Sequence, residues 1–424
     1  MSKSATVALK KIIKNLTNTH FLTALYVKIT LMKSADLIII GGGMVGLALA
    51  GLLKDSPCQI KIIEKSAPQT QKYYANRVSA INTASEKILQ QLGVFEHLPA
   101  DAHTDYQKII VSEKDSFAKI EFDNNDLAIK PLGLTQLGLI IANSQLQQAL
   151  WQQVSQQKNV EIILSTPKTI GISESGAFLT LENGEMLAGK LVVGADGAHS
   201  WLRNQVNIPL ISQDYQQTAL VCCVETAEPH NNIARQIFGP DSILAFLPLA
   251  DKNQCSIVWS LSPDQANKLT TCDEQQFNQA LTIAFDHQLG LVKLQDSRKI
   301  YPLTARYARD FAHMRIALIG DAAHTIHPLA GLGVNLGFAD AITLAEQIKL
   351  HLAAAHDIGE YRHLRYFERT RKTETIKLLA AMESLKQLFS GNNPLKKLIR
   401  GISLVGTNHF SAIKKRLIEQ VINI

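Results

Sequence analysis

The chain has 424 residues, 46% of them hydrophobic and 19% charged, which excludes a disordered protein and allows two or three domains with large cores. Residues 1–33 hold six lysines and no acidic residue, and removing these six from the 43 basic residues leaves 37, equal to the 37 acidic ones. The net charge of +6 therefore belongs to one end of the chain, and no nucleic acid partner is expected.

The basic N-terminal piece, residues 1–33, is expected to be an extension outside the folded part, either disordered or upstream of a true start at Met32. A weak amphipathic helix is the alternative; a targeting segment is also considered, but the piece has no arginine and its apolar run, residues 21–27, is short. No stretch reaches the roughly 18 apolar residues that a spanning helix needs. We expect a cytoplasmic protein, with peripheral contact at the inner face of the cytoplasmic membrane left open.

The first strong element is the apolar run of residues 35–40, which predicts a buried strand. The glycine-rich segment GGGMVG follows it and opens a helical pattern, and residues 59–64 predict a second strand. A strand, a glycine turn, a helix and a second strand in this order form a βαβ unit of the size that binds a dinucleotide.

The glycines of this turn, Gly41, Gly43 and Gly46, permit a tight turn and let a pyrophosphate approach the helix N-terminus. Glu64 follows Gly43 by 21 positions, where an acid can accept hydrogen bonds from ribose hydroxyls. Because residue 64 is acidic, FAD or NAD is favoured over a 2′-phosphorylated nucleotide. An ordinary glycine turn in an unrelated α/β unit is the alternative.

The later elements alternate between helices and strands, and the region 209–300 is rich in strands. Its cysteines Cys222 and Cys223 lie in an apolar strand-like run and are predicted to be core residues. The elements expected in chain order are a helix in 75–95, strands in 106–122, a helix at 143–157, strands up to 194, one helix near 273–288, a strand at 315–320, a long helix from 333 and helices in 360–420.

Several stretches carry a family resemblance. LVVGADGAHSWLR (191–203) and ALIGDAAHTIHPLAGLGVN (317–335) resemble the two later signatures of the single-component FAD aromatic hydroxylases, the p-hydroxybenzoate hydroxylase-like family. RVSAINTASEKILQQLGVF (77–95) and YPLTARYARDF (301–311) are similar to the ubiquinone-biosynthesis hydroxylases, and among these to the 2-polyprenylphenol hydroxylases. The resemblance extends from about residue 36 to residue 420.

The resemblance implies an α/β (α+β) fold in which a mostly antiparallel β-sheet substrate domain is inserted into a Rossmann-like FAD-binding domain. A C-terminal segment of basic amphipathic helices follows at 386–424. We expect the FAD-binding domain in 34–105, 138–208 and 300–385, and the substrate domain in 106–137 and 209–299.

The resemblance assigns cofactor contacts to two further signatures. Asp321, after Gly320, is expected to accept hydrogen bonds from the ribityl chain of FAD, with a helix N-cap as the alternative role. Asp196, Gly197 and Arg203 are expected to contact FAD and NAD(P)H, with a structural loop salt bridge as the alternative. Arg77 is also an expected cofactor contact, because it matches an arginine that lies along the cofactor in the family.

The glycine-rich loop after Asp321 is expected to face the flavin. Gly331, Gly333, Val334 and Asn335 would present backbone amides and a helix N-terminus to the flavin edge, and Pro328 would hold the loop against the ring. The family commonly has Gln where this chain has Leu332, so the backbone must make that contact. The acid and two histidines at 321, 324 and 327 could also suggest a metal site, but the glycines would then be unexplained, and no metal is expected.

The implied reaction uses NAD(P)H, FAD and O₂ to hydroxylate the ring of a polyprenylated phenol through a flavin C4a-hydroperoxide. No acid/base residue can be named from the sequence. The apolar segments 242–250 and 256–261 are candidate walls of a lipid channel, although a plain sheet core explains them equally well. The alternatives are a sister hydroxylase acting at another ring position, a flavin-dependent reductase or oxidase of the same fold, and a non-catalytic scaffold. A homo-oligomer and contacts with other ubiquinone-biosynthesis proteins stay open.

Overall fold

A computed structural model describes residues 33–69, 77–114, 116, 119–125, 135–326, 333–389 and 415. Most of the expected N-terminal extension and of the basic C-terminal segment lie outside this described part. None of the helices in the described ranges combines the length and the apolar character needed to cross a bilayer.

The first sheet has a parallel core in the order β19-β11-β1-β2-β8, with β18 antiparallel at one edge and the β9–β10 hairpin attached to β11. The strand β1 confirms the expected buried run, because Leu37 to Ile40 are almost fully buried. The strands are β1 (Lys33–Ile40), β2 (Ile60–Glu64), β8 (Val160–Leu164), β9 (Pro167–Ser173), β10 (Gly176–Leu181), β11 (Met186–Gly194), β18 (Ala312–His313) and β19 (Ile316–Leu318).

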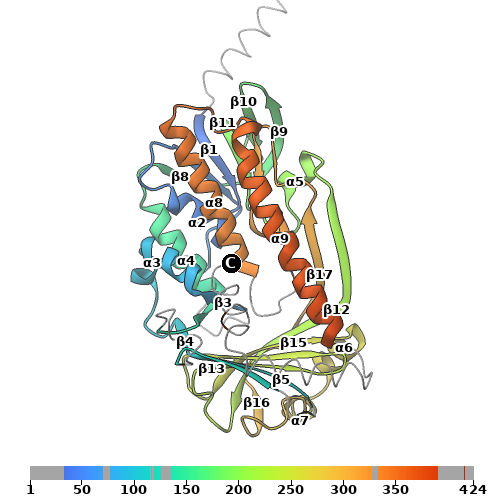
Figure 1. Ribbon diagram of the computed structural model, residues 1–424. Helices are drawn as coiled ribbons and strands as arrows, with labels where there is room; N and C mark the ends of the chain where they lie inside the picture. Colours follow the sequence, from blue (N-terminus) through green and yellow to red (C-terminus); the bar gives the residue numbers. More distant parts are fainter. Residues whose placement is uncertain are drawn as a thin grey trace, which may run out of the picture.

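Helices cover the parallel sheet and share one large apolar core with it. Among them, α2 packs against both α4 and α8, and α8 packs against α9, which continues towards the second sheet in Figure 1. Small residues at Gly46, Ala48 and Ala50 let α2 lie close to its neighbours. The helices and 3-10 turns are α2 (Met44–Leu52), α3 (Thr83–Gln91), η1 (Val94–His97), α4 (Asn143–Ser155), α5 (Trp201–Gln205), α6 (Pro263–Thr271), α7 (Glu274–Ala284), η3 (Gly320–Ala322), α8 (Gly333–Ala353) and α9 (Tyr361–Phe389).

The second sheet has the order β20-β17-β12-β15-β14-β13-β5-β6, with β16 attached to β12. Its described ladders are antiparallel except the one between β13 and β5, as the sequence predicts for an inserted, mostly antiparallel sheet. The strands are β5 (Lys108–Glu113), β6 (Lys119–Asp123), β12 (Leu210–Thr226), β13 (Ile233–Phe238), β14 (Ile243–Pro248), β15 (Gln254–Leu261), β16 (Val292–Leu294), β17 (Lys299–Ala308) and β20 (His324–Thr325).

Two long strands, β12 and β17, connect the two halves of the molecule (Figure 1). The strand β17 begins at Lys299, the expected end of the substrate domain, and pairs with β12 of the second sheet as far as Ala308. The register between β12 and β17 shifts between Asp214 and Gln217, and Gln216, within this interval, has a φ of +52°. This irregularity lets one pair of strands bend from one sheet towards the other.

Helices α6 and α7 cover one face of the second sheet. The sequence predicted one helix here and missed α6, although Ser262 and Pro263 are a start signal: the Ser262 side chain accepts a hydrogen bond from the amide of Gln265. Leu220, Phe246 and other sheet residues pack on this face against α7. Cys222 and Cys223 are 0% and 1% exposed, which confirms them as core residues.

A third, small sheet lies beside the parallel sheet and its helices. It consists of β3 (Val78–Asn82), β7 (Gly138–Ala142) and β4 (His103–Tyr106), in that order. Its strands alternate between two apolar groups. Ile81, Leu139 and Ile141 belong to the core of the parallel sheet, whereas Ala80 and Ile140 pack with residues of the second sheet. The small sheet therefore packs against both larger sheets.

Candidate cofactor and substrate site

The three sequence signatures meet at the carboxyl edge of the parallel sheet. The amide of Ala195, after β11, donates to the carbonyl of Ile40 at 2.8 Å. The amide of Ile319, after β19, donates to the carbonyl of Gly194 at 3.0 Å. Adjacent parallel strands end at the same edge, which is where open α/β sheets bind their ligands.

The turn after β1 needs glycine at two positions because of close packing, and a third glycine borders open space. Gly41 has a φ of +108°, and a Cβ there would lie 2.3 Å from the carbonyl oxygen of Ala195. A Cβ on Gly46 would lie 2.2 Å from the carbonyl oxygen of Gly41. At Gly43, the N-cap of α2, an added Cβ would meet no protein atom within 4 Å. Gly41 and Gly46 close the turn, while Gly43 leaves a free approach to its backbone.

Glu64, at the end of β2, lies directly against this turn. Its Oε2 accepts a hydrogen bond from the amide of Gly42 at 2.6 Å, and its Oε1 accepts one from the amide of Lys65 at 2.8 Å. The side chain of Gln147 on α4 donates to the carbonyl of Gly42 at 2.9 Å. The acid that the sequence predicts for ribose binding is thus oriented by the backbone of the glycine turn.

The second signature forms a compact loop before α5. The Oδ2 of Asp196 accepts from the amide of Leu202 at 3.0 Å, and the Ser200 side chain caps α5 by accepting from the amide of Arg203 at 3.0 Å. Burial raises the pKa of Asp196, and hydrogen bonds from Ser200 and Leu202 oppose the rise. Gly197 has a φ of +82° and borders open space.

Arg203 ties the second signature to the third. Its side chain is 2% exposed, and it donates to the carbonyl of Ala322 at 2.8 Å and to that of Ala198 at 2.9 Å. Among the described ion pairs there is none between Arg203 and Asp196, so the alternative reading, a loop salt bridge, does not hold for this pair. The guanidinium instead holds two loops together that are more than one hundred residues apart in sequence.

Asp321 lies in η3, directly after the buried strand β19. Its side chain is exposed, yet burial among the surrounding protein atoms still raises its pKa, while His324 and Arg77 lower it. An open group that is nevertheless densely surrounded is typical of a ligand site. The guanidinium of Arg77 lies 5.2 Å from the ring centre of Tyr301 on β17. Arg77 thus contacts the second sheet through Tyr301 and acts electrostatically on the Asp321 carboxylate.

A buried charge network supports the Asp321 turn, and the sequence analysis missed it. Asp340 on α8 is fully buried and accepts from the Nε2 of His324 at 2.6 Å, from the amide of Gly320 at 2.9 Å and from the Nε of Arg371 at 2.8 Å. Burial opposes its ionisation, but His324 and Arg371 hold its pKa below the ordinary range. His324, considered first as a metal ligand, is a structural partner of Asp340.

The flavin-facing loop is described only at its end. Pro328, Gly331, Leu332 and His327 lie outside the described residues. Gly333 and Val334 begin α8, and a Cβ on Gly333 would meet no protein atom within 4 Å.

Asn335, which was expected to contact the cofactor, is fully buried. Its Oδ1 accepts from the amide of Asn82 at 3.0 Å, and its Nδ2 donates to the carbonyl of Ala80 at 2.8 Å. Its side chain therefore fastens the start of α8 to β3.

The expected channel walls divide between two faces of the second sheet, because side chains alternate along a strand. Leu244 and Trp259 pack against α6 and α7, as a plain sheet core predicts. Ile243 and Leu247 point to the opposite face. They belong to apolar groups that include residues from outside the second sheet, such as Leu336 of α8. Only this second face can border a site between the two halves.

A cavity of about 270 Å³ lies between the long strands and α9. Most of its lining is apolar, with a carboxylate at one side. The lining residues are Ile211, Ser212, Gln213, Tyr215, Ala305, Tyr307, Ile376, Leu379, Ala380 and Glu383.

The residues at this edge fit a dinucleotide cofactor. Gly43, Gly197 and Gly333 come from three separate segments, and at each of them an added Cβ would meet no atom of the described residues within 4 Å. A helix N-terminus, an acid at the end of β2 and the Asp321 carboxylate surround the same edge. Backbone amides and carboxylates in this arrangement suit a pyrophosphate and hydroxyl groups, respectively.

Comparison with known proteins agrees with this geometry. Residues 34–373 match the family described as FAD binding domain. The zebrafish (Danio rerio) mitochondrial ubiquinone biosynthesis monooxygenase COQ6 is 32% identical, with 90% of this chain and 88% of that protein covered. The 3-demethoxyubiquinol 3-hydroxylase of Escherichia coli (strain K12) is 31% identical, with 92% of this chain and 99% of that protein covered.

Solved structures share the fold. The p-nitrophenol 4-monooxygenase PnpA from Pseudomonas putida DLL-E4 has a TM-score of 0.75 at 17% identity, and covers 92% of this chain and 99% of its own. The site geometry, the family match and the relatives together define a flavoprotein monooxygenase with FAD as cofactor and NAD(P)H as co-substrate. The chain belongs to the FAD-dependent monooxygenase family of ubiquinone biosynthesis. The narrower expectation of a 2-polyprenylphenol hydroxylase is not confirmed, and these relatives favour the sister ring hydroxylase.

Proposed function

We propose that this enzyme hydroxylates a prenylated phenolic ring of the ubiquinone pathway at the position used by 3-demethoxyubiquinol 3-hydroxylase, with a demethoxyubiquinol as substrate. The observation that carries the proposal is the match to that enzyme over 92% of this chain and 99% of the relative. A ring hydroxylation of this kind uses one O₂ and one NAD(P)H with a proton, and yields the hydroxylated ring, water and NAD(P)⁺.

The glycine turn and Glu64 are proposed to hold the adenosine end of FAD. The amides at the start of α2 would bind the pyrophosphate beside Gly43, where no protein atom would meet an added Cβ within 4 Å. Glu64 would accept from the ribose hydroxyls, since its carboxylate already faces the turn. Gly41 and Gly46 act through the shape of the turn.

The flavin end of the cofactor is proposed to lie between Asp321 and the start of α8. Asp321 would accept from the ribityl hydroxyls, and the amides of Gly333 and Val334 would face the pyrimidine edge. Pro328 and Gly331 keep their proposed roles in this loop. Bound FAD supplies the electron transfer and oxygen chemistry, which side chains alone cannot provide.

Four further residues are proposed to complete the cofactor site. Asp196 and Gly197 would contact the cofactor from the loop after β11, where Gly197 borders open space. Arg203 would act indirectly, because its side chain holds that loop to Ala322. Arg77 would lie along the cofactor, between Asp321 and Tyr301, as its electrostatic effect on Asp321 and its stacking distance indicate.

The ring substrate is proposed to bind between the flavin edge and the face of the second sheet opposite α6 and α7. Ile243, Leu247 and Tyr301 belong to apolar groups on this face. Apolar walls exclude water, which protects the oxygen-transfer step from wasteful side reactions. Ring positioning by these walls, rather than an acid/base pair, would then select the carbon that is hydroxylated.

The cavity between β12, β17 and α9 is proposed to take part of the prenyl tail. Its volume of about 270 Å³ is near the lower end of the roughly 300–1,000 Å³ usual for ligand pockets, so it would hold a few isoprene units. Peripheral membrane contact through 386–424 remains a prediction outside the described residues.

The test supplies the FAD-loaded enzyme with NAD(P)H and ¹⁸O₂, together with either a short-chain demethoxyubiquinol or a short-chain 2-polyprenylphenol. We expect one labelled oxygen in the demethoxyubiquinol ring, at a rate at least about 10-fold above that for the 2-polyprenylphenol, a difference of roughly 1.4 kcal/mol in the barrier. Mass spectrometry of the product measures the label.

The 2-polyprenylphenol arm separates the two sister activities. Preferential labelling of the 2-polyprenylphenol would overturn the proposed ring position and leave the family assignment intact. NAD(P)H oxidation that yields hydrogen peroxide and no labelled ring with either compound would overturn the hydroxylase proposal for these substrates.

A further inference from the structure

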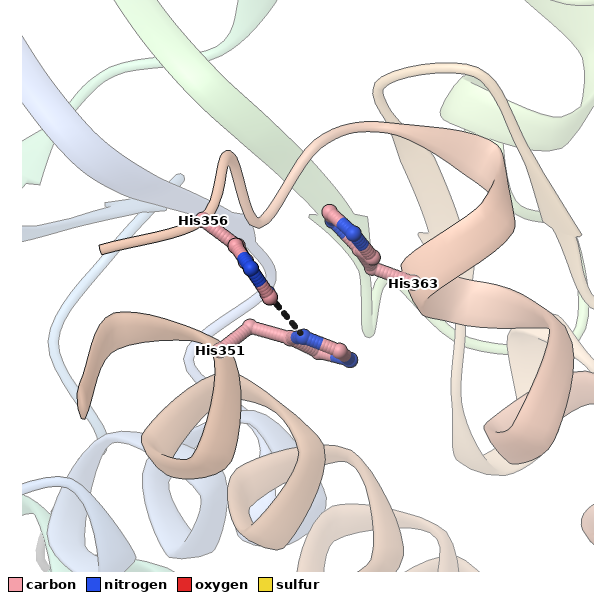
Figure 2. Close-up of side chains that lie close together, drawn as sticks. All are labelled: His351, His356 and His363. Atoms are coloured by element: carbon pink, nitrogen blue, oxygen red, sulfur yellow. Dashed lines mark hydrogen bonds between the residues drawn. The ribbon is translucent and has the colours of Figure 1, made fainter. Parts of the chain in front are cut away.

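Three histidines come together where α8 ends and α9 begins, far from the cofactor edge. His351 lies in the last turn of α8, His356 in the connecting segment and His363 in the first turn of α9. Figure 2 shows their rings gathered in the space between the two helix ends. One potential ligand nitrogen from each ring lies within 4.8 Å of the other two. Since α8 rises about 1.5 Å per residue, its length of 21 residues places this cluster roughly 30 Å from the flavin-facing end.

The hydrogen bonding of His363 leaves one ring nitrogen as a bare acceptor. Its Nδ1 lies 2.7 Å from the backbone carbonyl of Asp357, which can only accept, so Nδ1 carries the proton. In the neutral ring Nε2 then has a free lone pair. A histidine that donates one N–H to a backbone carbonyl and offers the other nitrogen is typical of metal ligands, because the carbonyl fixes tautomer and ring orientation.

The spacing of the other two rings also fits a shared ion. The Nδ1 atoms of His351 and His356 form a hydrogen bond (dashed in Figure 2), which at 3.4 Å is longer than the ordinary length of about 2.7–3.2 Å. Two nitrogens bound about 2.0–2.1 Å from a tetrahedral Zn²⁺ are separated by about 3.3–3.4 Å. The pair therefore already stands at the separation that the ion requires.

Ring stacking is the competing explanation for this arrangement. His351 and His363 stack with ring centres 4.2 Å apart, and His356 and His363 stack at 5.0 Å. Parallel rings cannot all direct lone pairs to one point, so binding needs a ring rotation. His356 is exposed and the other two are half-buried, which leaves room for that rotation.

We propose that His351, His356 and His363 bind one divalent transition metal ion, with Zn²⁺ as the expected ion and water completing a tetrahedral shell. Imidazole nitrogens suit Zn²⁺, and three of them with an open fourth position are an established donor set for this ion. The ion would fasten the end of α8 to the start of α9. The site is independent of the hydroxylase activity proposed above.

The test uses the tag-free, FAD-loaded full chain after removal of metals with a chelator. Titration calorimetry with Zn²⁺ should show one site per chain, and His356→Gln should weaken binding by at least about 10-fold. His356 is the variant of choice because it is exposed and makes little contact with the core. His287→Gln, at an exposed histidine after α7, is the matched control and should bind as the natural chain does.

A second readout guards against a folding defect in the variant. Zn²⁺ should raise the unfolding temperature of the natural chain and of His287→Gln, but not that of His356→Gln, because only a ligand that binds the folded state stabilises it. Co²⁺ should give the visible absorption of a tetrahedral complex in the first two proteins alone. Absence of stoichiometric Zn²⁺ binding, or equal binding by His356→Gln, would overturn the proposal.

Discussion

Replacing Asp340 by Asn is expected to destabilise the protein by about 3–5 kcal/mol, because it removes one partner from a fully buried charge network. Asn has nearly the same size as Asp, so the loss of stability measures the effect of removing the charge and not a change in volume. The guanidinium of Arg371, 6% exposed, would be left without its counter-charge, and the single amide oxygen of Asn could no longer accept from both His324 and Arg371. The free energy of unfolding, measured with denaturant on the FAD-free proteins, gives the difference.

The matched control for this substitution is Asp310→Asn. Asp310 pairs with the neighbouring Arg309 at 3.1 Å on the surface, where such pairs contribute about 0–1 kcal/mol.

The pH dependence of stability gives a further test of the role of Asp340. Since the pKa of Asp340 is lowered in the folded state, its contribution is present above the ordinary Asp pKa of about 3.9 and is lost as pH falls through the lowered value. If Asp340→Asn lowers the free energy of unfolding by less than about 1 kcal/mol at neutral pH, the buried network does not stabilise the fold as we expect.

Replacing Gly43 by Ala is expected to lower FAD affinity by at least about 10-fold, or roughly 1.4 kcal/mol, with little change in the stability of the FAD-free protein. The backbone of Gly43, with φ −76° and ψ 174°, is one that alanine adopts readily. The added methyl meets no protein atom within 4 Å and would therefore enter the space of the pyrophosphate. Flavin fluorescence titration measures the affinity.

Gly171→Ala is the matched control for Gly43→Ala. A Cβ at Gly171, in β9, also meets no protein atom within 4 Å, but the hairpin is remote from the carboxyl edge. Gly171→Ala should therefore bind FAD as the natural chain does. Equal FAD affinity of Gly43→Ala and the natural chain would show that the pyrophosphate does not lie against this turn.

The parts of the site that the sequence predicted are those set by short-range patterns. Gly41, Gly43 and Gly46 could be found because a strand, a turn and a helix follow one another directly. Glu64 could be found because one βαβ unit determines its distance from the turn. The buried strand at 35–40 and the mostly antiparallel second sheet follow in the same way from apolar runs and alternation.

The parts that the sequence did not predict depend on long-range packing. Asp340 and Arg371 are 31 residues apart on different helices, and only the packing of α8 against α9 brings them together. Arg203 and Asn335 were expected to touch the cofactor, but their side chains bond to backbone groups 119 and more than 250 residues away. No local signal in the chain identifies these partners.

One FAD is proposed to be held at the carboxyl edge of the parallel sheet by three separate segments of this chain. To test this, the folded chain is purified, the bound cofactor is released by denaturation, and its identity and amount are determined by mass spectrometry. We expect FAD, at one molecule per chain after saturation. A folded chain that retains no flavin after incubation with FAD, or that carries a different nucleotide in its place, would contradict it.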